Sequence, residues 1–145
     1  MQKHHIDTSI ILESEKTKDG RFCQRYLNKV RDYIHGIVSL PTLGELLLTI
    51  IRIEDLYKMR SFQDTVTHII HFHKISFYTP TKNIIKIQER ITELDRRIDT
   101  IDREILACSI EDKADYLITL DKDLIRNKKI ETEFKIRICH PKDLL

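Results

Sequence analysis

Short runs of β-branched and aromatic residues alternate with amphipathic stretches along the whole chain, and this alternation restricts the fold more than any other feature. The strand-like runs occupy residues 4–6, 36–40, 75–79, 116–119 and 134–139. Apolar residues three or four positions apart predict helices between them, at residues 42–52, 82–94 and 102–113. Strands that alternate with helices are typical of a mainly parallel sheet. We therefore expect an α/β domain with five strands.

The length of the chain, 145 residues, fits one domain spanning residues 1–145. Its three glycines cannot be assembled into a GxGxxG or Walker sequence, which excludes a Rossmann dinucleotide site and a P-loop. The cysteines, Cys23, Cys108 and Cys139, include no CxxC pair, so we expect reduced thiols without structural zinc. No apolar run approaches the ~20 residues of a membrane span, and the first residues lack the apolar core of a signal peptide. These features predict a cytoplasmic protein that does not enter a membrane.

Four acidic residues stand at positions where an α/β sheet usually binds ligands. Asp7 ends the first strand-like run, and Asp121 directly follows the fourth. Glu45 lies one turn into an apolar helix, and Asp102 opens another helix. Ligands of open α/β sheets bind outside the carboxyl ends of the strands. We therefore expect these four carboxylates to converge at that edge of the sheet.

Converging carboxylates need a compensating charge. Two carboxylates about 5 Å apart repel each other by ~3 kcal/mol at an effective dielectric constant of about 20. A divalent cation is the simplest remedy, and all-oxygen ligands suit Mg²⁺ or Mn²⁺ better than zinc. Taken singly, each acid also has an ordinary structural interpretation, as a helix-start, turn or solvent-facing residue. The functional interpretation depends on all four together.

Five segments resemble the signature sequences of the PIN-domain family, in the family's order along the chain. They are DTS (7–9), PTLGEL (41–46), DREILACS (102–109), ADYLITLDKDL (114–124) and IRICHP (136–141). The fourth segment is the most specific, whereas a DTS triplet alone is weak. The resemblance, to VapC-like toxin ribonucleases in particular, implies a three-layer α/β/α domain and hydrolysis of RNA by metal-bound water. The chain departs from the family in its polar first strand, Lys3-His4-His5-Ile6, and in Ser109, where the family usually has alanine.

The resemblance also implies roles for individual residues. The catalytic and metal-binding carboxylates, for Mg²⁺ or Mn²⁺, would be Asp7, Glu45, Asp102 and Asp121. Hydrogen bonds from Thr8, Ser9 and Thr119 would orient carboxylates or water, and Asp123 would be a peripheral partner. The implied partners are an RNA substrate, a VapB-like antitoxin and a second copy of the chain in a homodimer.

Basic residues flank the acidic ones, although the net charge of the chain is only +2. The candidate RNA contacts are Arg97, Arg103, Lys122 and Arg126. Cations beside an acidic centre can bind the phosphates of a nucleic acid. A solvated, charged surface explains the same residues equally well.

Other features leave alternatives open. The apolar faces of the helices expected at residues 14–33 and 58–72 either form a groove for the antitoxin or belong to the core. His68, His71 and His73 lack the fourth ligand of a zinc site, so we interpret them as surface or packing residues. Two further functions compete with the toxin: a housekeeping RNA-processing nuclease without an antitoxin, and a non-catalytic PIN scaffold that binds RNA or protein.

Overall fold

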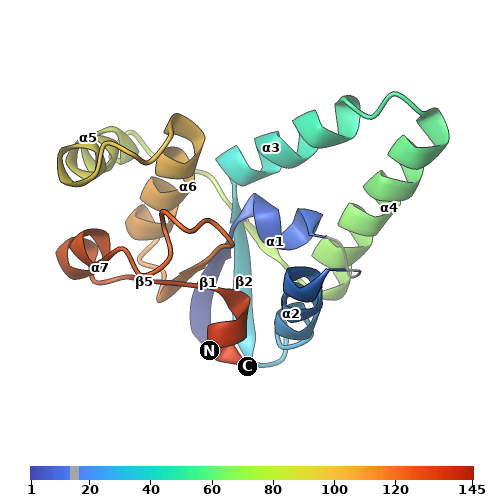
Figure 1. Ribbon diagram of the computed structural model, residues 1–145, viewed down its shortest axis with the longest axis horizontal. Helices are drawn as coiled ribbons and strands as arrows, with labels where there is room; N and C mark the ends of the chain where they lie inside the picture. The colour runs from blue at the N-terminus through green and yellow to red at the C-terminus, as the bar shows by residue number, and fades with distance from the viewer. Residues whose placement is uncertain (14–16) are drawn as a thin grey trace.

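The computed structural model describes residues 1–13 and 17–145, which form a parallel sheet between two layers of helices (Figure 1). In the described residues the sheet has five strands, in the order β3-β2-β1-β4-β5. The strands are β1 (Gln2–Ile6), β2 (Ile34–Ser39), β3 (Ser76–Tyr78), β4 (Tyr116–Ile118) and β5 (Arg137–Cys139). All neighbouring pairs are parallel. The α/β class and the five-stranded, parallel sheet are therefore confirmed.

Helices cover both faces of the sheet, which gives the three expected layers. One face is covered by α1 (Thr8–Leu12), α2 (Lys18–Leu27), α3 (Leu40–Ile51) and α4 (Leu56–Phe72). The other face is covered by α5 (Ile84–Leu94), α6 (Thr100–Glu111) and α7 (Lys128–Phe134) (Figure 1). A short 3₁₀ helix, η1 (Pro141–Leu144), contacts α2. None of the helices in the described residues combines the length and apolar character that crossing a membrane requires.

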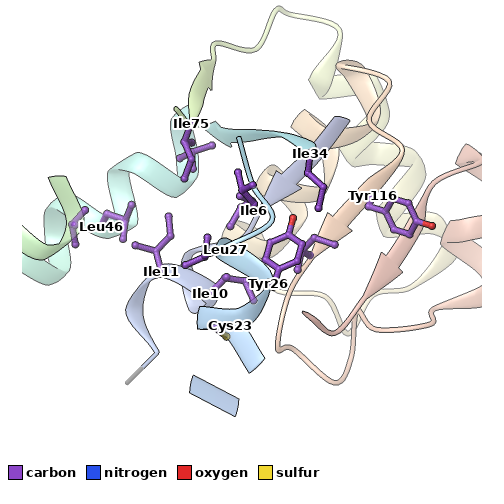
Figure 2. Close-up of a cluster of buried hydrophobic side chains, with 14 residues drawn as sticks. Ile6, Ile10, Ile11, Cys23, Tyr26, Leu27, Ile34, Leu46, Ile75 and Tyr116 are labelled. Carbon is purple, nitrogen blue, oxygen red and sulfur yellow. The ribbon is translucent and has the colours of Figure 1, made fainter. Parts of the chain in front are cut away.

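Each face of the sheet has its own hydrophobic core. Figure 2 shows the core beneath α1 and α2, where Tyr26 and Leu27 pack around Ile6 of the central strand. The second core lies beneath α5, α6 and α7 and includes Leu117. Ile118, the next residue of β4, belongs to the first core, because successive strand residues point to opposite faces. Burial on both faces fixes the sheet rigidly, and its carboxyl edge is held in place as a result.

The polar first strand is accommodated because each of its histidines has a hydrogen-bond partner. Nδ1 of His4 lies 2.9 Å from the hydroxyl oxygen of Tyr26, and burial lowers the pKa of His4 to about 4. His5 points to the other face, where its Nε2 lies 2.8 Å from a carboxylate oxygen of Asp112. Burial also lowers the pKa of His5. Hydrogen bonds lower the cost of neutral imidazoles in a central strand, although Nδ1 of His5 is buried and has no hydrogen-bond partner among the described residues.

Gly36 allows the strand next to β1 to pack closely. A Cβ atom at this position would lie 2.6 Å from Cγ1 of Val30 and 3.1 Å from Cδ1 of Ile6. Val30 is β-branched and cannot easily rotate away. A residue without a side chain is therefore required where β2 passes the core.

Several boundaries differ from the sequence-based expectation. β5 begins at Arg137 rather than at residue 134, because Phe134 closes the unexpected helix α7 and Lys135 adopts a left-handed conformation with φ 54°. Helix α6 begins at Thr100, since Asp99 and not Asp102 is its N-cap. Of the helix expected at residues 14–33, positions 14–16 lie outside the described residues, and α2 covers only Lys18–Leu27.

Candidate active site

The candidate site is a cavity of about 440 Å³ at the carboxyl ends of β1 and β4. The residues that line it are Asp7, Thr8, Ser9, Leu12, Glu13, Glu45, Asp102, Leu120 and Asp121. β1 and β4 are adjacent and parallel, so the residues that follow them meet at one edge of the sheet. The cavity, which we call the acidic cavity, thus brings together all four carboxylates singled out in the sequence. Glu13 is an additional acid that sequence reasoning missed.

Asp7 is the most deeply placed of these carboxylates, with 6% of its surface exposed. It occupies the N-cap position of α1, yet its side chain makes no capping hydrogen bond. The carboxylate instead accepts hydrogen bonds from Oγ1 of Thr119 at 2.8 Å and from Oγ of Ser9 at 2.9 Å. Burial raises the pKa of Asp7, and the charge of Asp121 adds to this effect. The helix-start interpretation therefore does not explain where this side chain points.

Two hydroxyl groups connect the ends of β1 and β4. Oγ1 of Thr119, besides donating to Asp7, accepts a hydrogen bond from the backbone N–H of Asp121 at 3.1 Å. Oγ of Ser9 likewise accepts from the backbone N–H of Leu120 at 3.2 Å. These bonds fix the position of Asp7 relative to the loop that carries Asp121.

The backbone of the following loop orients Asp121. Its Oδ1 accepts a hydrogen bond from the N–H of Asp123 at 2.9 Å. The carboxylate of Asp123 itself is exposed and does not line the acidic cavity. Asp123 thus contributes through its main chain rather than through its charge.

Glu45 enters the cavity from the second turn of α3, and Asp102 enters it from the first turn of α6. Glu45, on α3, accepts a hydrogen bond from Oγ1 of Thr8 at 2.6 Å. Burial raises the pKa of Glu45, with smaller contributions from the charges of Asp7 and Asp99. Burial, a hydrogen bond with Asp121 and neighbouring charges raise the pKa of Asp102 to about 8. Crowded carboxylates without a cation have this electrostatic signature.

Asp99 adds negative charge that the sequence analysis did not assign to the site. Its side chain accepts a hydrogen bond from the N–H of Asp102 at 2.9 Å and caps α6. Its charge raises the pKa of both Glu45 and Asp102. The spacing Asp99-x-x-Asp102 is that of an N-cap side chain and the backbone N–H that donates to it, and it could have identified the start of the helix.

The donor set of the cavity is entirely carboxylate and hydroxyl oxygen, which are the ligand types of Mg²⁺ and Mn²⁺. In the described part of the chain, no three His, Cys, Asp or Glu side chains already form a group that could hold a metal ion. The donors therefore fit such a cation in kind, and the side chains would have to draw together around it.

The candidate RNA contacts differ in their availability. Lys122 and Arg126 are exposed on the loop after β4, and Arg97 is held by Asp95. Arg103 faces α5 instead, where its Nη1 donates to Oγ1 of Thr92 at 2.8 Å. Arg103 is consequently the weakest of the four candidates.

The remaining residues considered as ligands or nucleophiles serve packing. His73 is buried, and His68 stacks on Phe72 with 5.4 Å between ring centroids. Cys108 is fully buried in α6, and burial raises the pKa of its thiol to about 12. A thiol with this pKa is not a nucleophile near neutral pH.

Comparison with known proteins finds solved structures with a similar fold but no related sequence. No family model and no curated protein sequence matches the chain. VapBC2 from Rickettsia felis, solved with a DNA fragment from its promoter, superimposes with a TM-score of 0.68 and 16% identity over 96% of this chain and 98% of that chain. FitAcB from Neisseria gonorrhoeae superimposes with a TM-score of 0.67 and 15% identity over 96% of this chain and 98% of that chain. VapBC-1 from nontypeable Haemophilus influenzae superimposes with a TM-score of 0.65 and 14% identity over 97% of this chain and 99% of that chain. These similarities confirm the PIN-like fold over at least 96% of the chain.

Proposed function

We propose that the chain is a metal-dependent endoribonuclease and the toxin component of a VapBC-type toxin–antitoxin pair. One observation carries the nuclease proposal: acids from four separate segments line one cavity, and none of the described residues lining it is a lysine or arginine. Mutually repelling carboxylates are costly to gather, and a fold that only needs stability has no use for them. The fold shared with VapBC and FitAcB structures supports the choice of toxin.

The residues that would hold Mg²⁺ or Mn²⁺ are Asp7, Glu45, Asp102 and Asp121. A divalent cation in such a site supplies an activated water and neutralises charge on the phosphoryl oxygens. Thr119 and Ser9 hold the Asp7 carboxylate in one orientation, and Thr8 holds that of Glu45. Such hydrogen bonds keep the ligand oxygens from turning away and raise metal affinity.

Binding of a cation in the acidic cavity would be linked to the protonation of Asp102. Its carboxyl keeps a proton near neutral pH, because its pKa is raised to about 8 by burial and by its acidic neighbours. Release of this proton accompanies the arrival of a cation, so the affinity for the cation increases with pH.

The test is cleavage of labelled single-stranded RNA with Mn²⁺, then with EDTA, then with Mn²⁺ restored. We expect cleavage with Mn²⁺, no cleavage with EDTA, and cleavage again once Mn²⁺ is restored. Activity that ignores EDTA would indicate a contaminating ribonuclease, and inactivity on a range of RNAs would favour the non-catalytic scaffold. The Asp7→Asn variant, prepared in parallel, is expected to be inactive under all three conditions.

The antitoxin proposal has its own support in a second cavity of about 580 Å³ between α1, α2 and α4. Its lining includes the apolar side chains of Leu12, Leu27, Phe62, Ile69 and Phe72. This apolar cavity shares Leu12 and Glu13 with the acidic cavity. A peptide segment bound there would therefore end beside the carboxylates and could block them.

The gene next to this one provides the test of the antitoxin. If a short adjacent reading frame encodes a DNA-binding protein, its product should co-purify with the chain and inhibit cleavage. Phe62→Asp should weaken that complex, with a melting curve to check folding. Full activity in the absence of any such neighbour would favour the housekeeping nuclease. The homodimer implied by the resemblance stays a prediction, which light scattering of the purified chain tests.

A further inference from the structure

We infer that the RNA strand leaves the acidic cavity on one side only, over the loop after β4, where basic side chains bind its phosphates. This inference rests on the proposed nuclease function and adds the path of the substrate. It involves Lys122, Arg126 and Lys129, which are exposed on or next to that loop.

The path is a continuous series of depressions in the surface. The acidic cavity shares Leu120 with a neighbouring cavity of about 240 Å³. That cavity shares Lys122, Ile125 and Arg126 with a third one of about 410 Å³. A strand bound at the carboxylates therefore passes only Leu120 and the shared loop residues on its way to the third cavity.

The charge reverses along this path. The acidic cavity is lined by five acids, whereas the third cavity, here called the basic cavity, is lined by five cations against two acids. The five cations are Arg97, Lys122, Arg126, Lys128 and Lys129. A polyanion is repelled by the carboxylates themselves, so its affinity has to come from phosphate contacts beside them.

Asp95 gives the basic cavity a fixed geometry. With 8% of its surface exposed, its carboxylate accepts hydrogen bonds from Nε of Arg97 at 3.1 Å, from Nη2 of Arg97 at 3.0 Å and from Nδ2 of Asn127 at 3.0 Å. The charge of Asp95 is thereby neutralised within the chain. The Arg97 side chain, 73% exposed, is held in place with Nη1 outside these bonds.

The loop between the two cavities is also braced. Arg126 adopts a left-handed conformation with φ 56°, and its N–H bonds to the carbonyl of Ile138 at 3.1 Å. The side chain of Asn127 accepts from the N–H of Ile130 at 3.3 Å and caps α7. Arg126 makes an ion pair with Asp143, and Lys128 makes one with Glu131. In both pairs the basic side chain is exposed. Exposed pairs of this kind are weak, so a phosphate can replace the carboxylate.

The opposite side of the acidic cavity offers no comparable set of cations. There the lining of the apolar cavity combines six apolar side chains with Glu13 and five neutral polar or histidine side chains, and none of its described lining residues is a lysine or arginine. The strand and a protein partner would therefore approach the carboxylates from different sides.

The test is the salt dependence of RNA binding, measured by fluorescence anisotropy in EDTA with a labelled single-stranded RNA of about 12 nucleotides. The variant is the full chain with Lys122→Gln and Lys129→Gln. For single strands, each phosphate contact contributes about −0.7 to the slope of log K against log salt. We expect a slope that is shallower by ~1.4 and, near physiological salt, an affinity about tenfold lower than that of the wild type.

The matched control carries Lys58→Gln and Lys82→Gln. These lysines are exposed on α4 and before α5, away from the basic cavity, and the net charge changes by the same amount. The control should keep the wild-type slope. Equal losses in both variants, no loss in either, or a wild type that does not bind the probe would each overturn the inference.

The outcome is separable from that of the nuclease proposal. Binding in EDTA does not require cleavage, so a chain that binds over the basic cavity but never cleaves RNA refutes only the nuclease. A chain that cleaves RNA with unchanged salt dependence in the Lys122→Gln and Lys129→Gln variant refutes only the path.

Discussion

Asp7 and Asp95 are both aspartates withdrawn from solvent, yet their pKa values shift in opposite directions. Burial raises the pKa of Asp7, whose partners are two hydroxyl groups. Hydrogen bonds from the side chain and backbone of Arg97 hold the pKa of Asp95 well below its usual range. The chain neutralises one carboxylate with its own cation and leaves the other without one. Burial alone therefore does not mark a functional acid, whereas burial without a cation does.

The strongest test of this contrast is Asp7→Asn. We expect RNA cleavage to fall by more than the ~10- to 100-fold that loss of an outer-shell partner costs a metal site. The melting temperature without metal should stay equal or increase, because a desolvated charge and its repulsion with Asp121 are removed. Activity assays and melting curves on the same preparation check both. Full activity would show that Asp7 is not part of the catalytic site.

Thr119→Val removes the hydroxyl that donates a hydrogen bond to Asp7, while keeping the shape of the side chain. We expect cleavage to fall by about 10- to 100-fold and to require more Mn²⁺. Thr119→Ser, which keeps the hydroxyl, is the matched control and should retain most of the activity. If both variants behave alike, the hydrogen bond at 2.8 Å does not position Asp7 for function.

The pH dependence of stability separates the aspartates of the acidic cavity from Asp95. The pKa of Asp102 is about 8 in the folded chain against an ordinary value of 3.8, and that of Asp7 is raised too. The folded state then holds protons that the unfolded state releases, so stability falls as the pH rises toward the folded pKa. Asp95 has the opposite sign, and its contribution is lost only in strong acid.

We therefore expect the melting temperature of the metal-free protein to fall between about pH 6.5 and about pH 8 and to level off above the folded pKa of Asp102. His4, with a pKa of about 4, is neutral throughout this range in the folded state and does not interfere. Mn²⁺ should reverse the fall, and Asp102→Asn should flatten it. A melting temperature that rises over this range would contradict the assignment of Asp102 to a crowded acidic site.

Asp95→Asn is expected to have the smallest effect and the opposite sign on stability. The amide loses charge-assisted hydrogen bonds from Arg97, and we expect the free energy of unfolding to fall by less than about 1 kcal/mol, because Arg97 is exposed. Denaturant unfolding measures this loss. Arg97→Gln should also destabilise the fold, since it breaks the same bonds. A stabilised Asp95→Asn variant would remove the distinction between the two aspartates.

The sheet was predictable because its strands are short apolar runs with Ile, Val, Phe and Tyr between helical segments. Helix α7 was not, because it is short and in the described structure only Ile130 among its residues is buried. Phe134 therefore looked like the start of β5, although it ends the helix. Local pattern cannot distinguish these two states for a single aromatic residue beside a strand.

The four carboxylates were predictable from their places at strand ends and in the early turns of helices. Their neighbours were not, because the bond between Thr8 and Glu45 depends on how α1 packs against α3. Asp95 lies outside every signature segment, and its partner Asn127 is 32 positions away. Relations of this kind follow from tertiary packing, which a single sequence does not display.

β1 lies at the middle of the sheet although it precedes the other strands in the chain. On one of its edges it pairs with β4, and Asp7 meets Thr119, 112 positions later, only once that pairing forms. In a nascent chain on the ribosome, the acids that line the acidic cavity therefore stay far apart until nearly the whole domain has been synthesised. Until β4 is synthesised, the unpaired edge of β1 can pair with other strands and aggregate, which chaperones usually prevent.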